Sequence, residues 1–98
     1  MNTTWAEVLA RTEDMLSAAR SGAFEKVSAL ELERRALLKT MTAEGEEAKS
    51  LLGEIVERDR ELIAIVESAR QQAADLLRQA RQAQAGAGAY LGVATRRY

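Results

Sequence analysis

The sequence has 98 residues, of which 47% are hydrophobic and 30% charged, with no proline and few aromatic side chains. This length allows one domain at most, and this composition is typical of long helices rather than of a disordered chain or a β-sandwich. Because histidine and cysteine are absent, disulfides, a thiol nucleophile and zinc–thiolate sites are excluded. The longest apolar run, Leu62–Val66, is far below the ~18 residues that span a bilayer. No secretory signal is recognisable, so we expect a cytoplasmic protein without membrane insertion.

The net charge of −1 is unevenly distributed along the chain. Residues 68–98 contain five arginines and one aspartate, a charge of +4, whereas residues 1–67 carry −5. Without an overall basic character, the chain is not expected to bind nucleic acid. A basic end on an acidic body indicates a partner for that end, although an ordinary solvated helix surface would carry the same charges.

The first predicted helix spans residues 4–21. Thr4 and Glu7 have the spacing of a capping box, which satisfies free amides of the first helical turn. Gly22 stands where a left-handed residue after a helix is expected. The helical periodicity predicts one apolar face, with Thr12 interrupting it. The residues of this face are Trp5, Val8, Leu9, Met15, Leu16 and Ala19.

The second predicted helix spans residues 23–41 and also has one apolar face. The residues of this face are Phe24, Val27, Leu30, Leu37, Leu38 and Met41. Arg34 falls near its centre, where an apolar residue would be the default, and Leu32 points away from it. Residues 42–45 are predicted to form a turn, with Thr42 as a candidate N-cap for the next helix.

The third predicted helix is the longest and spans residues 46–85. Its apolar residues recur in a heptad rhythm, with Asp59 at one seam position. In the first half, Val56 and Ile63 widen the apolar arc so far that two neighbouring helices are needed to cover it. A glycine-rich stretch then predicts that the helix ends and that residues 86–98 form a short frayed tail.

Arg34 and Asp59 are charged residues at the centres of apolar faces. An ion pair between them would offset the cost of burying either charge and would set the register of the two helices. A short connection, however, places Arg34 opposite Gly53, six residues or about 9 Å from Asp59. The alternative is an Asp59 that is partly solvated at the edge of the packed region.

These elements predict an all-α fold. Residues 1–98 form a single domain, an antiparallel three-helix bundle with a long third helix and a short C-terminal tail. The first two helices, at about 25–29 Å, are too short to cover a third helix of roughly 60 Å. The far half of that helix therefore needs cover from a second copy, a foreign helix or the tail with Tyr90, Leu91 and Tyr98.

Catalysis is not expected. Acidic pairs such as Glu54 and Glu57 have ordinary helix-surface spacing. A dimetal site in a four-helix bundle needs histidines, which this chain lacks. We therefore expect no enzyme activity, no metal and no cofactor.

Three segments resemble the FliT family of flagellar export chaperones. Residues 22–38, GAFEKVSALELERRALL, are similar to the family's second helix, in which a glycine, an aromatic and an acidic residue lead into L-E-x-E-R-x-x-L-L. Residues 51–62, LLGEIVERDREL, resemble L-L-x-x-I-L-x-x-D-x-x-I of its third helix, with Asp59 at the aspartate. Ala89 and Tyr90 match the A-Y that follows a small, glycine-containing break, so the likeness covers nearly the whole chain.

The resemblance implies a cytoplasmic helical chaperone that binds the C-terminal region of the filament-cap protein, FliD. Such a chaperone keeps the cap protein monomeric and delivers it to the export gate of the flagellar type III secretion apparatus. Some members also bind a flagellar transcription regulator. In better-known members a C-terminal helix shields the binding surface, whereas this chain ends at Tyr98, too soon for a long shielding helix.

A chaperone of this kind needs an open apolar groove with a polar rim. The candidate partner-binding residues are Leu62, Val66, Ala69, Arg70, Ala73, Leu76 and Leu77, with Arg70 as a rim charge. The same residues could instead form the seam of a homodimer. Two other functions stay open: a FlgN-type chaperone for hook–filament junction proteins, and a structural antiparallel coiled-coil oligomer.

Overall fold

The computed structural model describes the chain from residue 4 to residue 96, and its side chains from residue 4 to residue 88. Three helices follow one another in this range, α1 (Trp5–Arg20), α2 (Phe24–Leu38) and α3 (Glu46–Arg96). The predicted all-α fold with a long third helix is confirmed. α3 has 51 residues, against 16 in α1 and 15 in α2.

α1 begins and ends where its sequence signals predict. The Thr4 hydroxyl accepts a hydrogen bond from the Glu7 amide at 3.3 Å and so satisfies one of the free donors of the first turn. At the other end, Gly22 has a φ of 78°, a conformation that glycine adopts without a steric penalty. The Ser21 and Gly22 amides donate to the carbonyl groups of Ser17 and Ala19. These bonds close α1 immediately before α2 begins.

α2 ends at Leu38, short of the predicted residue 41, and residues 39–45 connect it to α3. The Thr40 hydroxyl donates to the Leu37 carbonyl at 3.0 Å, a local bond that competes with continuation of the helix. Trp5 holds the connection, because its indole Nε1 donates to the Thr42 carbonyl at 2.9 Å. Thr42 thus lies within the connection and does not cap α3.

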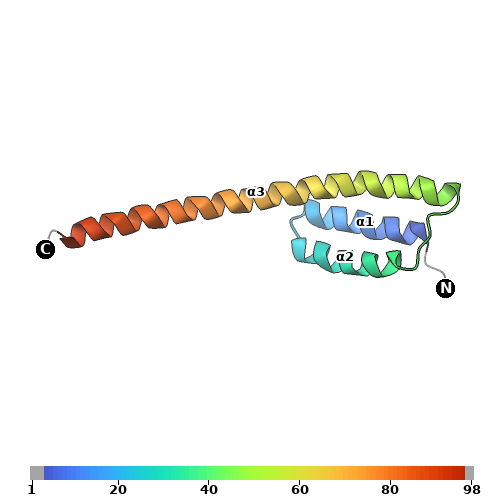
Figure 1. The fold of residues 1–98 in the computed structure, drawn as a ribbon, viewed down its shortest axis with the longest axis horizontal. Coiled ribbons are helices and arrows are strands. Elements are labelled where there is room, and N and C mark those ends of the chain that lie inside the picture. Colours follow the sequence, from blue (N-terminus) through green and yellow to red (C-terminus); the bar gives the residue numbers. More distant parts are fainter. Residues whose placement is uncertain (1–3, 97–98) are drawn as a thin grey trace. The chain divides into compact units, whose positions relative to one another are not determined.

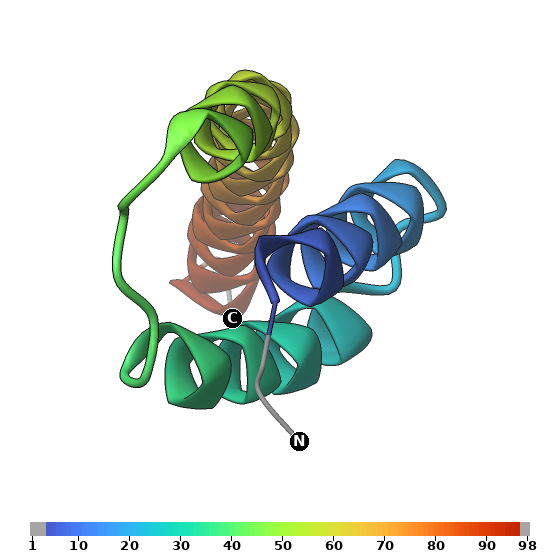
Figure 2. The same cartoon turned by 90° about the vertical axis from the view of Figure 1, so that its right-hand side faces the viewer.

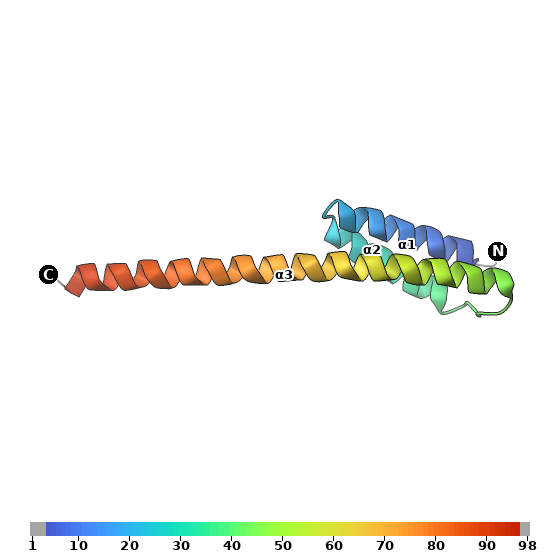
Figure 3. The ribbon, with the colours of Figure 1, turned by 90° about the horizontal axis from the view of Figure 1, so that it is seen from above.

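The first unit of the structure reaches as far as Val66, and within it the three helices form a bundle. Seen end-on, α1, α2 and the first part of α3 stand at the corners of a triangle (Figure 2). α2 runs antiparallel to both of its neighbours, and α1 runs in the same direction as the first part of α3 (Figure 1). Seen from above, the connection after α2 reaches back to the start of α3 (Figure 3).

The core of this unit lies where the apolar faces of the three helices meet. Met15, Val8 and Thr12 of α1 are its most deeply buried large side chains. The other core residues are Leu16, Ala18, Ala19, Val27, Ala48, Ile55 and Leu62. α1 contributes most of the core because α2 and α3 both pack against it.

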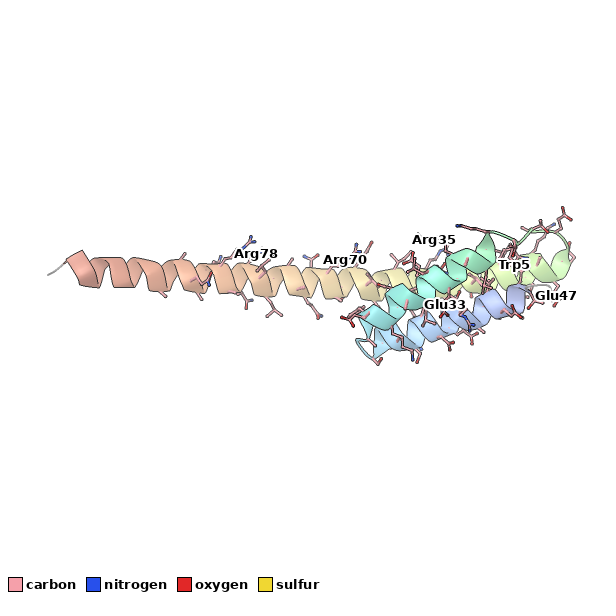
Figure 4. All side chains as sticks on the ribbon, turned by 90° about the horizontal axis from the view of Figure 1, so that it is seen from below. Trp5, Glu33, Arg35, Glu47, Arg70 and Arg78 are labelled. Carbon is pink, nitrogen blue, oxygen red and sulfur yellow. The ribbon has the colours of Figure 1, made fainter. Side chains whose placement is uncertain are left out.

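Ion pairs join α1 to both neighbours around this core. Arg11 pairs with Glu33 of α2, and Glu13 pairs with Arg58 of α3, each at 3.3 Å. Figure 4 shows Glu33 on the side of α2 that faces α1, and Arg35 on the side toward α3. Exposed pairs of this kind contribute only about 0–1 kcal/mol each, so most of the stability comes from the apolar core.

The second unit begins at Glu67, and its described part consists of α3 alone. The predicted break at Gly86 is wrong, because α3 continues through Gly86 and Gly88 to Arg96. Neither glycine has a positive φ. Each destabilises a helix by only about 1 kcal/mol relative to alanine, and the surrounding alanines and glutamines favour the helix.

The predicted short tail is therefore largely the last part of α3. A tail that leaves the helix at residue 86 and folds back is contradicted by this continuity. The side chains of Tyr90, Leu91 and Tyr98, considered above as a cover, lie outside the described residues.

Candidate functional site

The second unit exposes a strip of apolar side chains on one face of α3. We define this outer stripe as Ala69, Ala73, Leu76, Leu77 and Ala80. Leu76 is 66% exposed and Leu77 53% exposed, although both are large hydrophobic residues. Ala73 and Ala80 are exposed as well, and Ala69 is half-buried. Because these residues are separated by three and four positions, they lie on one face of the helix. The stripe presents two leucines between small residues, a surface against which another helix can pack closely.

Two of the seven predicted partner-binding residues lie elsewhere. Leu62 is buried in the core of the first unit together with Met15, and Val66 packs against the same cluster. The prediction placed both on an uncovered face, but Arg20 at the end of α1 pairs with Glu61. The last turn of α1 is therefore level with this part of α3 and covers it. Leu62 and Val66 are structural residues of the bundle.

The two edges of the outer stripe differ in chemistry. At 100° per residue, Arg70 and Arg81 lie on one edge, which we call the basic edge. Gln72 and Gln79 lie on the opposite edge, the amide edge. Within the part of the chain whose side chains are described, no acidic group lies within ion-pair distance of either basic-edge arginine. The basic edge therefore has two charges available to a partner.

Arg78 differs from the basic-edge arginines although it belongs to the same stretch of α3. Its guanidinium pairs with Asp75, three residues earlier. Arg70 and Arg78 both project from α3 in Figure 4. The helical spacing nevertheless places Arg78 about 80° around the axis from Arg70, outside the basic edge.

Large apolar side chains are also exposed on α2 and α3 of the first unit. The contact of Arg34 with Asp59 sets the level at which these helices meet. Leu38 lies one turn after Arg34, and Val56 lies one turn before Asp59, so the antiparallel helices bring them to the same level. Leu38, Val56 and Ile63 are exposed. The spacing of Leu38 predicts a core-facing residue, but the structure shows it exposed. The wide apolar arc predicted in the first half of α3 includes Val56 and Ile63, which are exposed as well.

The polar residues in the bundle bind one another. Arg34 Nη1 donates to Asp59 Oδ1 at 2.6 Å and to Thr12 Oγ1 at 3.1 Å, and the Thr12 hydroxyl donates to the Val8 carbonyl at 2.9 Å. The predicted ion pair is thus present. The Asp59 side chain is also 31% exposed, so the partly solvated alternative describes it correctly too. One side chain from each helix takes part, and the network joins the three helices instead of presenting a reactive group.

Metal binding and membrane insertion receive no support from the described residues. No cluster of three or more potential ligand residues in this range could hold a metal ion. No described helix combines the length and the apolar character that a membrane crossing requires. The exposed apolar surfaces, and above all the outer stripe, are therefore the features that suggest a function.

Comparison with known families agrees with a role in binding another protein. A family model described as flagellar protein FliT matches residues 2–92. The chain belongs to the FliT family. This match confirms the resemblance found in the sequence. Comparisons with curated proteins and with solved structures gave no match.

FliT-family chaperones are non-enzymatic. The family implies flagellar protein partners. In this FliT-family protein, five of the predicted contact residues remain together on the second unit: Ala69, Arg70, Ala73, Leu76 and Leu77.

Proposed function

We propose that this FliT-family protein is a cytoplasmic export chaperone for the flagellar filament-cap protein. It binds this client, prevents its premature assembly and delivers it to the flagellar type III export apparatus. Family membership supports a flagellar client. The observation that carries the proposal is the pair Leu76 and Leu77, the two large apolar residues of the described part of the second unit, both more than half exposed.

The physical basis is helix-in-groove recognition. A protein that assembles into a filament cap needs apolar helical surfaces, and these would associate prematurely if they stayed open in the cytoplasm. A chaperone can cover such a surface with an apolar stripe of its own between polar edges. The outer stripe has this form, with leucines and alanines between arginines and glutamines.

Release of the client is the second requirement of an export chaperone. The outer stripe contains two large apolar side chains and otherwise mainly alanines, so it offers a limited apolar area to a partner. This favours moderate affinity, which lets the export gate take over the client. We propose a gate component as the second partner and a flagellar transcription regulator as a further one.

Calorimetry with the full chain and the filament-cap protein of the same bacterium tests this function. Replacing Leu76 and Leu77 by alanine should weaken binding by about 1–3 kcal/mol, the value of two partly buried leucines. Leu32→Ala is a matched control, because Leu32 is also highly exposed but lies on α2 in the first unit. The control should bind the client as the unmodified chain does.

Other outcomes would assign a different function. Tight binding to hook–filament junction proteins, with none to the cap protein, would make this a FlgN-type chaperone and would overturn the proposal. Sedimentation distinguishes a structural oligomer. An oligomer that persists at low micromolar concentration and does not exchange its self-contact for the cap protein would also contradict the proposed function.

A further inference from the structure

We infer that the outer stripe receives a client helix that carries carboxylates along one edge, and that the basic edge admits this helix in one direction only. This inference rests on the proposed function, because it specifies the chemistry of the client segment. It follows from the unequal edges of the outer stripe and from the ion pairs within α3.

The basic edge has a defined spacing. Arg70 and Arg81 are eleven residues apart, which corresponds to about 16 Å along α3 and a rotation of only about 20°. Both arginines therefore lie on the same side of the stripe, one near each end of the segment that contains Leu76 and Leu77. A client helix that packs along this segment meets both guanidinium groups if it has acidic residues eleven positions apart on one edge.

These two charges are not used within the described chain. Asp75 pairs with Arg78 outside the basic edge, and Glu67, three positions before Arg70, is not within ion-pair distance of it. Arg70 and Arg81 have no acidic neighbour within ion-pair distance among the described side chains. Arginine binds carboxylates through two parallel N–H donors, which makes these positions suited to a client aspartate or glutamate.

The opposite edge determines the direction of the client helix. Gln72 and Gln79 carry no charge and offer amide donors and acceptors instead. A client helix with acidic residues on one edge faces Arg70 and Arg81 in one direction. When the helix is reversed, its carboxylates face the glutamines and the ion pairs are lost. The asymmetric edges thus select one orientation.

The same asymmetry disfavours a second copy of this chain as the occupant. In an antiparallel pair, identical edges face each other, so Arg70 and Arg81 of one copy would meet the same arginines of the other. In a parallel pair the basic edge would meet the amide edge, without an opposite charge. An acidic client provides two ion pairs that neither self-arrangement provides.

The test compares charge reversals on two faces of the same segment. Arg70→Glu with Arg81→Glu removes the basic edge, whereas Arg78→Glu makes the same kind of change outside it. Binding of the full chain to the filament-cap protein is measured by calorimetry at low and high salt, and circular dichroism checks that each variant is folded. Leu76→Ala with Leu77→Ala serves as the reference for loss of the stripe itself.

We expect the double reversal to weaken binding at low salt by about tenfold and to reverse the salt dependence, so that added salt strengthens binding, because salt at 0.1 M screens the repulsion between like charges beyond about 10 Å. Arg78→Glu should change the affinity less than threefold. In the client, two acidic residues eleven positions apart can be replaced by lysine. This client variant should again bind the chain that carries Arg70→Glu and Arg81→Glu. Restoration by this exchange would establish the direction of the client helix.

The possible failures separate the inference from the proposed function. If the double reversal binds normally while the leucine variant binds weakly, the inference is overturned and the proposed function stands. If the unmodified chain does not bind the cap protein at all, both fall. If sedimentation shows a dimer that the leucine variant dissociates and the double reversal leaves intact, the occupant is a second copy, and the inference is again overturned.

Discussion

The guanidinium of Arg34 contacts the carboxylate of Asp59 at 2.6 Å, joining α2 to α3 at positions where both helices are otherwise apolar. The same guanidinium nitrogen also reaches the fully buried Thr12 of α1. This pair fixes the register of the bundle, because sliding α2 by one turn would separate the two charges by about 5 Å. It also leaves the Arg34 side chain only 14% exposed, so the charge depends on its partner.

Removing one member of this pair should destabilise the bundle. Asp59→Ala leaves the Arg34 charge poorly hydrated and without its partner, which should lower the free energy of unfolding by about 1–3 kcal/mol. Urea unfolding followed by circular dichroism measures this change. Arg34→Met combined with Asp59→Leu removes both charges and should recover at least half of the loss. If Asp59→Ala is as stable as the unmodified chain, solvent replaces the ion pair.

Adjacent positions on α3 should respond very differently to truncation. Ile55 is 6% exposed, whereas Val56 is 46% exposed. Ile55→Ala should lower the free energy of unfolding by about 2–4 kcal/mol, because it leaves a cavity in the core. Val56→Ala, the matched control, should lower it by less than about 1 kcal/mol. Equal effects in thermal unfolding would contradict the packing of α3 described above.

The hydrogen bond of Trp5 should hold the connection between α2 and α3. Trp5→Phe keeps an aromatic ring but removes the donor to the Thr42 carbonyl, which should lower the free energy of unfolding by about 0.5–1.5 kcal/mol. Amides of residues 39–45 should then exchange faster with deuterium. Thr42→Ala retains the acceptor, which belongs to the backbone, and should leave exchange unchanged. An unchanged exchange rate in Trp5→Phe would mean that the bond does not restrain this segment.

The glycines of the helix interior and those of the turns should respond in opposite directions to alanine. Gly86 and Gly88 have helical conformations and open space where a Cβ would lie. Alanine at each should stabilise α3 locally by about 0.5–1 kcal/mol. Hydrogen exchange of the amides around residue 87 measures this as slower exchange. Faster exchange would favour the predicted break over the continuous helix.

Gly22 provides the contrast. Its φ of 78° is unfavourable for any residue with a Cβ, although no atom stands in the way of one. Gly22→Ala should therefore lower the free energy of unfolding of the first unit by about 1–2 kcal/mol. A stabilised Gly22→Ala in thermal unfolding would show that the α1–α2 turn can adopt another conformation.

Local sequence signals determined where α1 begins and ends and where α3 begins. The capping box at Thr4, the glycine at position 22 and the periodic apolar residues act over three or four neighbouring positions, so their effects do not depend on distant contacts. The end of α1 at Arg20 and the start of α3 at Glu46 were therefore predictable. The pairing of Arg34 with Asp59 was predictable as chemistry, since two opposite charges in apolar faces need partners.

Tertiary structure decided the register and hence which part of α3 is covered. A short connection would set Arg34 opposite Gly53, but residues 39–45 span the distance that brings it to Asp59. The difference in free energy between alternative registers comes from packing across all three helices. It exceeds the local conformational preferences of the connection. This choice buried Leu62 beneath α1 and left Leu76 and Leu77 exposed. The sequence by itself determined that α3 has an apolar face longer than its neighbours, whereas only the packed bundle decided where on α3 the available surface begins.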